Sequence, residues 1–313
     1  MTFMILGGLG FLGQNLCRML ADYEKDIIVY NRESKHAHTV EESLTRDHIK
    51  HKVVWGNFED EGSWEDKLKN VNLVFHLIST TKPSNTNMMY EFSSNVEASI
   101  RFLEMCAKLN VRVIFFSSGG TVYGMPRCLP IDELHATNPI STYGISKLAI
   151  EKCLVYYGYT KKLNYTILRI ANPYGKGQNL NNLQGFIGIS LSRALQGQDI
   201  EVWGDGNIIR DYIYMDDLMD AVKRVVLYNG NYRIFNVGYS KGYSINEIVS
   251  IIQRYINPRV FVKYKEGRIQ DVSANILSHD LLRNETGWVP KVSIEEGIKR
   301  MIYSWDDDKK IFV

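Results

Sequence analysis

Tyr143 and Lys147 are the first candidates for chemistry, because they stand four residues apart in the segment Tyr143-Gly144-Ile145-Ser146-Lys147. If this segment is helical, one turn brings both side chains to the same face. A nearby ammonium group favours the phenolate and lowers the pKa of a tyrosine from its ordinary value of about 10. The pair therefore predicts a tyrosine that serves as a general base near neutral pH, tuned by Lys147.

A glycine-rich turn, Gly7-Gly8-Leu9-Gly10-Phe11-Leu12-Gly13, follows an apolar run at 3–6 and opens an amphipathic segment at 12–21. Glycines at the first, fourth and seventh positions allow a tight turn, close approach of a pyrophosphate, and close packing of a helix on a strand. The start of that helix adds unpaired N–H groups and the positive end of its dipole. The turn predicts a dinucleotide site formed by Gly7, Gly10, Phe11, Leu12 and Gly13.

The end of the second predicted strand bears on which dinucleotide binds. An Asp or Glu that accepts hydrogen bonds from the adenosine ribose usually stands about 20 residues after the glycines. Here Asn31 and Arg32 occupy that place. Without a carboxylate a 2′-phosphate is not repelled, and Arg32 could pair with it, although an arginine past a strand is often only a solvated loop residue. NAD and NADP both stay open.

Short β-branched and aromatic runs alternate with longer helical patterns in the first half of the chain, as in βαβ units with a parallel sheet buried on both faces. We expect strands at 3–6, 27–30, 53–55, 73–78, 111–117 and 165–170, and helices at 12–21, 87–110 and 146–157. The expected fold is a doubly wound α/β domain at 1–171, with a smaller substrate-binding lobe at 172–313 that returns some segments to the first domain.

Composition excludes several classes of protein. The chain has 37 basic and 35 acidic residues, a net charge of +2, and no basic stretch that would indicate nucleic-acid binding. Its four cysteines are scattered without metal-ligand spacing, so we expect no metal site. No apolar run approaches the ~18 residues that span a bilayer, and we expect a cytoplasmic protein without membrane insertion.

These motifs together resemble the extended short-chain dehydrogenases/reductases that act on nucleotide sugars as epimerases and dehydratases, with UDP-hexose 4-epimerases the nearest match. The resemblance covers nearly the whole chain. Besides the glycine turn and the Tyr143/Lys147 pair, it includes the segments 116–124, 56–57, 75–77, 172–175, 203–206, 210–217 and 267–272. It implies NAD or NADP as cofactor, a nucleotide-sugar substrate, a sugar-interconversion or surface-polysaccharide pathway, and a homodimer formed through the helices at 87–110 and 146–157.

The resemblance also implies roles for single residues near the cofactor. Asn57 and Phe58 would flank the adenine, Leu77 the nicotinamide ribose, and Lys82 the phosphates. Lys147 would bind the nicotinamide ribose as well as tune Tyr143. The full implied cofactor set is Gly7, Gly10, Phe11, Leu12, Gly13, Asn31, Arg32, Asn57, Phe58, Leu77, Lys82, Asn95, Ser117, Tyr143 and Lys147.

On the substrate side, the resemblance implies that Asn172 contacts the sugar diphosphate and that Arg210 and Arg268 clamp it, a task for which guanidinium geometry is suited. Asp271 would bind a ribose hydroxyl.

One departure from the family pattern concerns the hydroxyl that bridges the sugar 4-OH and the tyrosine. The family has Ser or Thr where this chain has Gly119, so Ser118 or Thr121 must take that part as a catalytic residue. Gly120 and Thr121 also stand where 4,6-dehydratases carry an acidic pair. Without those carboxylates, dehydration lacks its acid and base.

Two enzymatic readings and one non-enzymatic reading follow. In an NAD(P)-dependent 4-epimerase, Tyr143 takes the proton of the sugar 4-OH while the cofactor oxidises C4, and the 4-keto ring turns before it is reduced on the other face. In an NADPH-dependent 4-reductase, the same pair protonates a 4-keto-6-deoxy sugar nucleotide. A cofactor-binding scaffold without activity is the third reading, and the presence of both Tyr143 and Lys147 argues against it.

Overall fold

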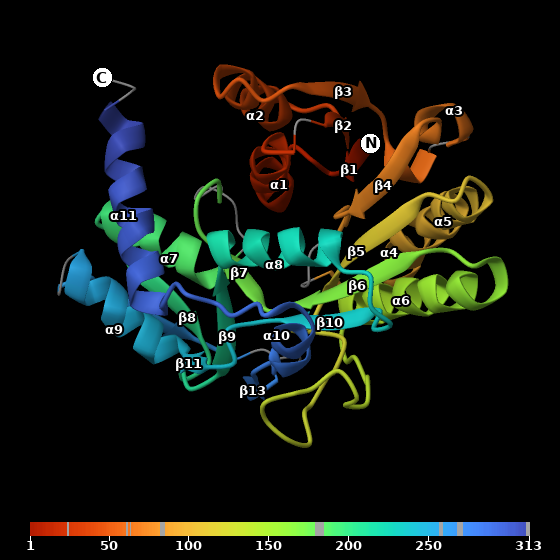
Figure 1. The fold of residues 1–313 in the computed structure, drawn as a ribbon. Coiled ribbons are helices and arrows are strands. Elements are labelled where there is room, and N and C mark those ends of the chain that lie inside the picture. The colour runs from red at the N-terminus through yellow and green to blue at the C-terminus, as the bar shows by residue number, and fades with distance from the viewer. Residues whose placement is uncertain are drawn as a thin grey trace. The chain divides into compact units, whose positions relative to one another are not determined.

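A computed structural model describes the chain except residues 24, 61, 63, 82–84, 179–184, 257–258, 268–271 and 311–313, and the side chains of 305–310. The chain divides into two compact units (Figure 1). Unit 1 comprises 1–124, 137–169 and 229–235, and unit 2 comprises 125–136, 170–228 and 236–313.

A seven-stranded sheet forms the centre of unit 1, with strand order β10-β6-β5-β4-β1-β2-β3. The pairs β1–β2, β1–β4, β2–β3 and β4–β5 are parallel. The strands are β1 (Thr2–Leu6), β2 (Asp26–Asn31), β3 (His51–Trp55), β4 (Val71–His76), β5 (Arg112–Ser118), β6 (Tyr165–Ile170) and β10 (Ile234–Val237). The crossovers that this order requires confirm the predicted doubly wound fold.

Helices α1 (Phe11–Ala21) and α2 (Lys35–Arg46) lie on one side of the sheet, and α5 (Ala98–Lys108) and α6 (Thr142–Lys161) on the other (Figure 1). The helix expected at 87–110 is a continuous run of α4 (Met88–Glu91), the π-helix η2 (Phe92–Glu97) and α5. The remaining helices of unit 1 are η1 (Phe58–Asp60) and α3 (Glu65–Leu68).

Helix α6 starts at Thr142 because the side chain of Ser141 accepts a hydrogen bond from the backbone N–H of Gly144. It ends where Lys162 adopts the left-handed conformation. The cap places Tyr143 in the first turn and Lys147 one turn later.

Unit 2 contains a small sheet in which β9 pairs with β11, β13 and β7, and a separate pair of β12 with β8. Its core is apolar and includes Tyr174, Ile187, Tyr212 and Ile298. Its elements are β7 (Asn172–Tyr174), α7 (Phe186–Leu195), β8 (Ile200–Trp203), β9 (Ile209–Tyr214), α8 (Met215–Leu227), β11 (Gly242–Ser244), α9 (Ile245–Tyr255), β12 (Val262–Lys265), β13 (Ala274–Asn275), α10 (Asp280–Thr286) and α11 (Ile294–Lys310).

Across the helices that the structure describes, none is long and apolar enough to cross a membrane. Nor do the side chains within these described ranges gather three potential metal ligands at one point.

His76, at the end of β4, is a polar residue inside the aromatic core of unit 1. Its ring contacts the rings of Phe58, Phe102 and Phe115, and its Nε2 lies 3.0 Å from the hydroxyl of Ser99. Burial, with a smaller contribution from Lys147, lowers the pKa of His76 to about 3. The folded protein therefore holds this histidine neutral.

Acidification should destabilise the protein through His76. Because its pKa is lower in the folded state than the ordinary 6.5, the unfolded state binds the extra proton between these values, and stability falls as pH drops below about 6.5. For each pH unit of acidification in this range, His76 should lower the free energy of unfolding by up to about 1.4 kcal/mol. Urea titrations from pH 7 to 4 should show a shallower decline for His76→Leu. Equal declines in both proteins would contradict this account.

Candidate active site

The glycine turn between β1 and α1 has the geometry of an anion cradle. Gly7 has a φ of +82°, and a Cβ on Gly13 would lie 2.4 Å from the carbonyl oxygen of Gly7, so α1 packs directly on the turn. No side chain caps the start of α1, and no acidic residue stands in its first turn. N–H groups and the positive helix end are thus available to a pyrophosphate, and these residues fit a dinucleotide.

Asn31 supports this turn from the end of β2. Its Oδ1 accepts a hydrogen bond from the backbone N–H of Leu9, and its Nδ2 donates to the carbonyl of Arg32. Arg32 itself is exposed. At the position where a carboxylate would bind the adenosine ribose, this chain therefore has Asn31, whose side chain orders the glycine turn.

Lys147 is buried and lies close to Tyr143, as the spacing predicts. Its Nζ donates a hydrogen bond of 3.1 Å to the carbonyl of Phe116, lies 4.9 Å from the centre of the Phe115 ring, and lies 5.7 Å from the centre of the Tyr143 ring. Burial lowers the pKa of Lys147 to about 8, against the opposing effect of Glu91 and Glu151. The pKa of the Lys147 ammonium thus lies close to neutral pH.

The prediction that the protein lowers the pKa of Tyr143 is wrong for the chain's own groups. Burial, followed by the carboxylate of Glu91, raises the pKa of this phenol well above its usual range. These two effects outweigh the nearby ammonium. The chain's own groups therefore favour the protonated phenol.

A buried ion pair lies beside this site. The Arg169 guanidinium on β6 makes hydrogen bonds of 2.7–3.2 Å to both carboxylate oxygens of Glu151 on α6, and both side chains are at most 3% exposed. Arg169 also donates to the hydroxyl of Tyr123, and Ser117 donates to Glu151. Ser117 is one of the residues predicted to contact the cofactor, and in the structure its hydroxyl donates its hydrogen bond to Glu151.

Asn95 lies in η2 and uses its amide on the protein. Its Oδ1 accepts from the backbone N–H and hydroxyl of Thr80, and its Nδ2 donates to Thr81 and Glu91. Sequence reasoning placed Asn95 against the cofactor. In the structure its amide anchors the loop that follows β4, and the contact with the cofactor stays a prediction.

The two residues predicted to flank the adenine, Asn57 and Phe58, differ in their exposure to solvent. Asn57 is partly exposed and donates to Asp60. Phe58 is 3% exposed, with its ring packed against Trp64, His76 and Phe102, and its place beside the adenine stays a prediction. Leu77 follows β4 and donates its N–H to Leu6. Lys82 lies outside the described residues.

The two candidate bridging hydroxyls have different surroundings. Ser118 ends β5 and is partly buried, and its carbonyl accepts the N–H groups of Thr121 and Val122. Thr121 has a buried hydroxyl for which the described chain provides no hydrogen-bond partner. A buried, unpaired hydroxyl is costly, and such groups in native proteins often serve a ligand.

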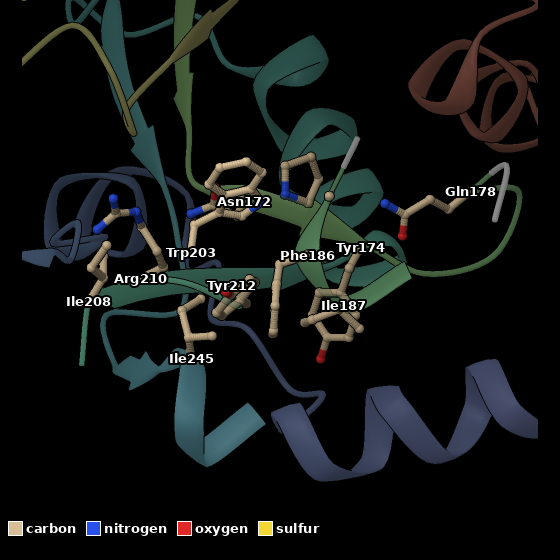
Figure 2. A pocket seen from close by; sticks show the side chains of 12 residues that line it. Asn172, Tyr174, Gln178, Phe186, Ile187, Trp203, Ile208, Arg210, Tyr212 and Ile245 are labelled. Atoms are coloured by element: carbon tan, nitrogen blue, oxygen red, sulfur yellow. The ribbon is translucent and has the colours of Figure 1, made fainter. Parts of the chain in front are cut away.

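A pocket of about 320 Å³ in unit 2 is lined by Asn172, Phe186, Trp203, Arg210 and Tyr212, among others (Figure 2). The Nη1 of Arg210 donates to the carbonyls of Ile209 and Val272, which fixes the guanidinium in place. The Nδ2 of Asn172 donates to the carbonyl of Asp211. Arg268 and Asp271 lie outside the described residues.

Sequence reasoning missed Glu91, Glu151 and Arg169. A signal for two of them exists, because Glu151 follows Lys147 by one helical turn and Arg169 interrupts the apolar run of β6. A charged residue in an otherwise apolar pattern indicates a buried partner.

Breaking the buried pair should be more harmful than removing it. Arg169→Met leaves Glu151 charged in the core and should cost about 3–5 kcal/mol of unfolding free energy. The double variant Arg169→Met/Glu151→Leu should recover much of that loss. Urea unfolding of the double variant and of the two single variants, Arg169→Met and Glu151→Leu, measures the coupling, and a double variant whose loss equals the sum of the two single losses would refute it.

The chain resembles known proteins in both sequence and fold. Residues 3–238 match the NAD dependent epimerase/dehydratase family. A putative UDP-glucose 4-epimerase of Methanocaldococcus jannaschii is 31% identical over 308 residues, which is 96% of each chain. The dTDP-4-dehydro-6-deoxyglucose reductase of Escherichia coli is 28% identical over 305 residues, again 96% of each chain.

Among solved structures, the UDP-glucose 4-epimerase of Thermotoga maritima with UDP-glucose superposes with a TM-score of 0.91 at 30% identity, over 99% of this chain and all of that one. The match extends beyond the cofactor-binding fold to the complete chain. This protein is a member of the NAD dependent epimerase/dehydratase family.

Proposed function

We propose that the protein is an NAD-dependent UDP-hexose 4-epimerase that acts through a transient 4-keto sugar. The observation that carries the proposal is the buried Tyr143/Lys147 pair in a chain that matches a UDP-glucose 4-epimerase structure along its whole length. Unit 1, with its glycine turn, serves the cofactor, and unit 2, with its pocket, serves the nucleotide sugar.

Tyr143 takes the proton from the sugar 4-OH and later returns it. NAD, when bound, supplies the reversible oxidation at C4, and the positive charge of its oxidised nicotinamide ring would add to that of Lys147. Since burial and Glu91 keep the phenol protonated in the protein alone, this added charge makes Tyr143 a base only when the cofactor is ready to oxidise. Lys147, held through Phe116, also binds the nicotinamide ribose.

Thr121 supplies the bridging hydroxyl in place of the residue missing at Gly119. Its buried hydroxyl needs a partner, and the sugar 4-OH provides one.

Arg210 and Asn172 hold the diphosphate, together with Arg268, and Asp271 binds a ribose hydroxyl. The fixed guanidinium of Arg210 supports this role, because a clamp that is already oriented loses little side-chain entropy on binding. The nucleotide stays bound while the hexose turns.

We further propose a cytoplasmic homodimer that uses the outer face of α5 and α6. On α6 this face exposes apolar side chains, with Tyr156 60% and Tyr159 83% exposed. Exposed aromatic residues on a helix favour a protein interface.

A one-way 4-reductase is the second candidate, favoured by the similarity to the E. coli reductase and by the glycine at 119. A reductase must exchange a reduced cofactor at each turnover, whereas an epimerase keeps its own.

Cofactor retention separates the two. The purified protein should release stoichiometric NAD on denaturation, identified by absorbance and mass. The native protein should convert UDP-galactose or UDP-N-acetylgalactosamine to the C4 epimer without added cofactor. An empty protein that converts neither sugar, but oxidises NADPH with a 4-keto-6-deoxy sugar nucleotide, would establish the reductase instead.

Substitution at Thr121 tests the bridging role. Thr121→Val keeps the shape and removes the hydroxyl, and should lower kcat about 10- to 100-fold, as expected for a hydrogen bond to a partly charged group. Thr121→Ser should retain most activity, and Ser118→Ala should change kcat about twofold or less. Steady-state kinetics with UDP-galactose measures all three, and the reverse ranking of Ser118→Ala and Thr121→Val would assign the role to Ser118.

A further inference from the structure

Glu91, the last residue of α4, is a fully buried carboxylate beside the Tyr143/Lys147 pair. Its Oε1 accepts hydrogen bonds from the Ser146 hydroxyl at 2.8 Å and the Asn95 amide at 3.1 Å. Its Oε2 accepts from the Asn85 amide at 2.9 Å. All three donors are neutral, so Glu91 is well hydrogen-bonded but its charge is not cancelled locally.

Glu151, the other carboxylate acting on Lys147, has a different status. Arg169 forms a close ion pair with it, and this pair is nearly neutral as seen from Lys147. The described residues give Glu91 no such ion pair. A buried charge needs a partner, so the charge left over on Glu91 and the charge left over on Lys147 balance each other.

We propose that Glu91 is a positioning residue for the reaction, a buried counter-ion that keeps Lys147 charged and keeps Tyr143 protonated until the cofactor is oxidised. The inference rests on the proposed function for its kinetic consequences, but the electrostatic coupling belongs to the protein itself. Glu91 raises the pKa of both Tyr143 and Lys147. Among the described residues, Lys147 also interacts with Glu151, which is paired with Arg169, and with the neutral His76.

The contacts of Glu91 also explain why its position is fixed. Ser146 lies between Tyr143 and Lys147 on α6, and its hydroxyl is 2.9 Å from the carbonyl of Tyr143 as well as 2.8 Å from Glu91. Asn95 joins Glu91 to the Thr80 loop. The carboxylate thus connects α6 to η2 and to the loop after β4.

The variant Glu91→Gln tests the counter-ion role, because it removes the charge and keeps the size. Both Tyr143 and Lys147 should then titrate lower, so both limbs of the bell-shaped pH profile of kcat should move to lower pH by about one unit, with KM changed less than about twofold. A purely structural defect would lower the maximum kcat and leave the apparent pKa values of the pH profile unchanged.

Three further variants act as controls. Glu97→Gln removes an exposed carboxylate of η2 that pairs with Arg101, and should leave the profile unchanged. Ser146→Ala removes a hydrogen bond to Glu91 and keeps the charge. Glu91→Asp keeps the charge with altered hydrogen bonds. Both should lower kcat without moving the limbs, so they test the proposal even if Glu91→Gln fails to fold.

A second measurement does not need turnover. The Nζ of Lys147 can be followed by NMR in protein labelled with isotopic lysine, its signal identified by its loss in Lys147→Arg. Its titration should fall by about one pH unit in Glu91→Gln and stay in place in Glu97→Gln. The proposal would be overturned if the pKa of Lys147 were unchanged in Glu91→Gln. It would also be overturned if Glu91→Asp shifted the pH profile of kcat as far as is expected for Glu91→Gln. If no UDP-hexose is converted, the proposed function fails while this titration still decides the role of Glu91.

Discussion

The burial of charge along one face of α6 is the constraint on which the site depends. Lys147 and Glu151 occupy successive turns of this helix inside the core, where an uncompensated charge would be too costly to keep. Arg169 compensates Glu151, and Glu91 acts on the charge of Lys147. The four groups sum to zero charge, so the ammonium can remain buried next to Tyr143 without being fully neutralised by a direct partner.

Because of this charge balance, the ionisation of the Tyr143 phenol depends on what else is bound in the site. Tyr143 is a poor base in the protein alone, because burial and Glu91 both oppose its ionisation. In the proposed reaction, a further positive charge in the site reverses that preference and links the base to the state of the cofactor. The hydrogen bond from the Leu9 N–H to Asn31 holds the glycine turn, which is the proposed cofactor site.

Much of the fold could be predicted from the sequence, because parallel strands buried on both faces read as apolar runs and the glycine turn has a defined place in such a sheet. Tyr143 and Lys147 could be predicted as a pair because helical spacing alone brings them together. The hydrogen bonds of Glu91 with Ser146 and of Asn95 with Thr80, and the packing of Phe58 on His76 and Phe102, could not be predicted, since these partners come from distant segments. Spacing also reveals the ammonium but not the burial or the opposing carboxylate, which is why the chain's own groups raise the pKa of Tyr143 where Lys147 alone was expected to lower it.

The central claim is that one bound cofactor oxidises and then reduces the same sugar carbon while Tyr143 moves the proton. UDP-galactose carrying deuterium at C4 tests it directly, with the product analysed by mass spectrometry and NMR. The account predicts UDP-glucose that retains the deuterium at C4 and gains none from deuterated solvent. Loss of the label to solvent, or product formed only when NADPH is added, would contradict it.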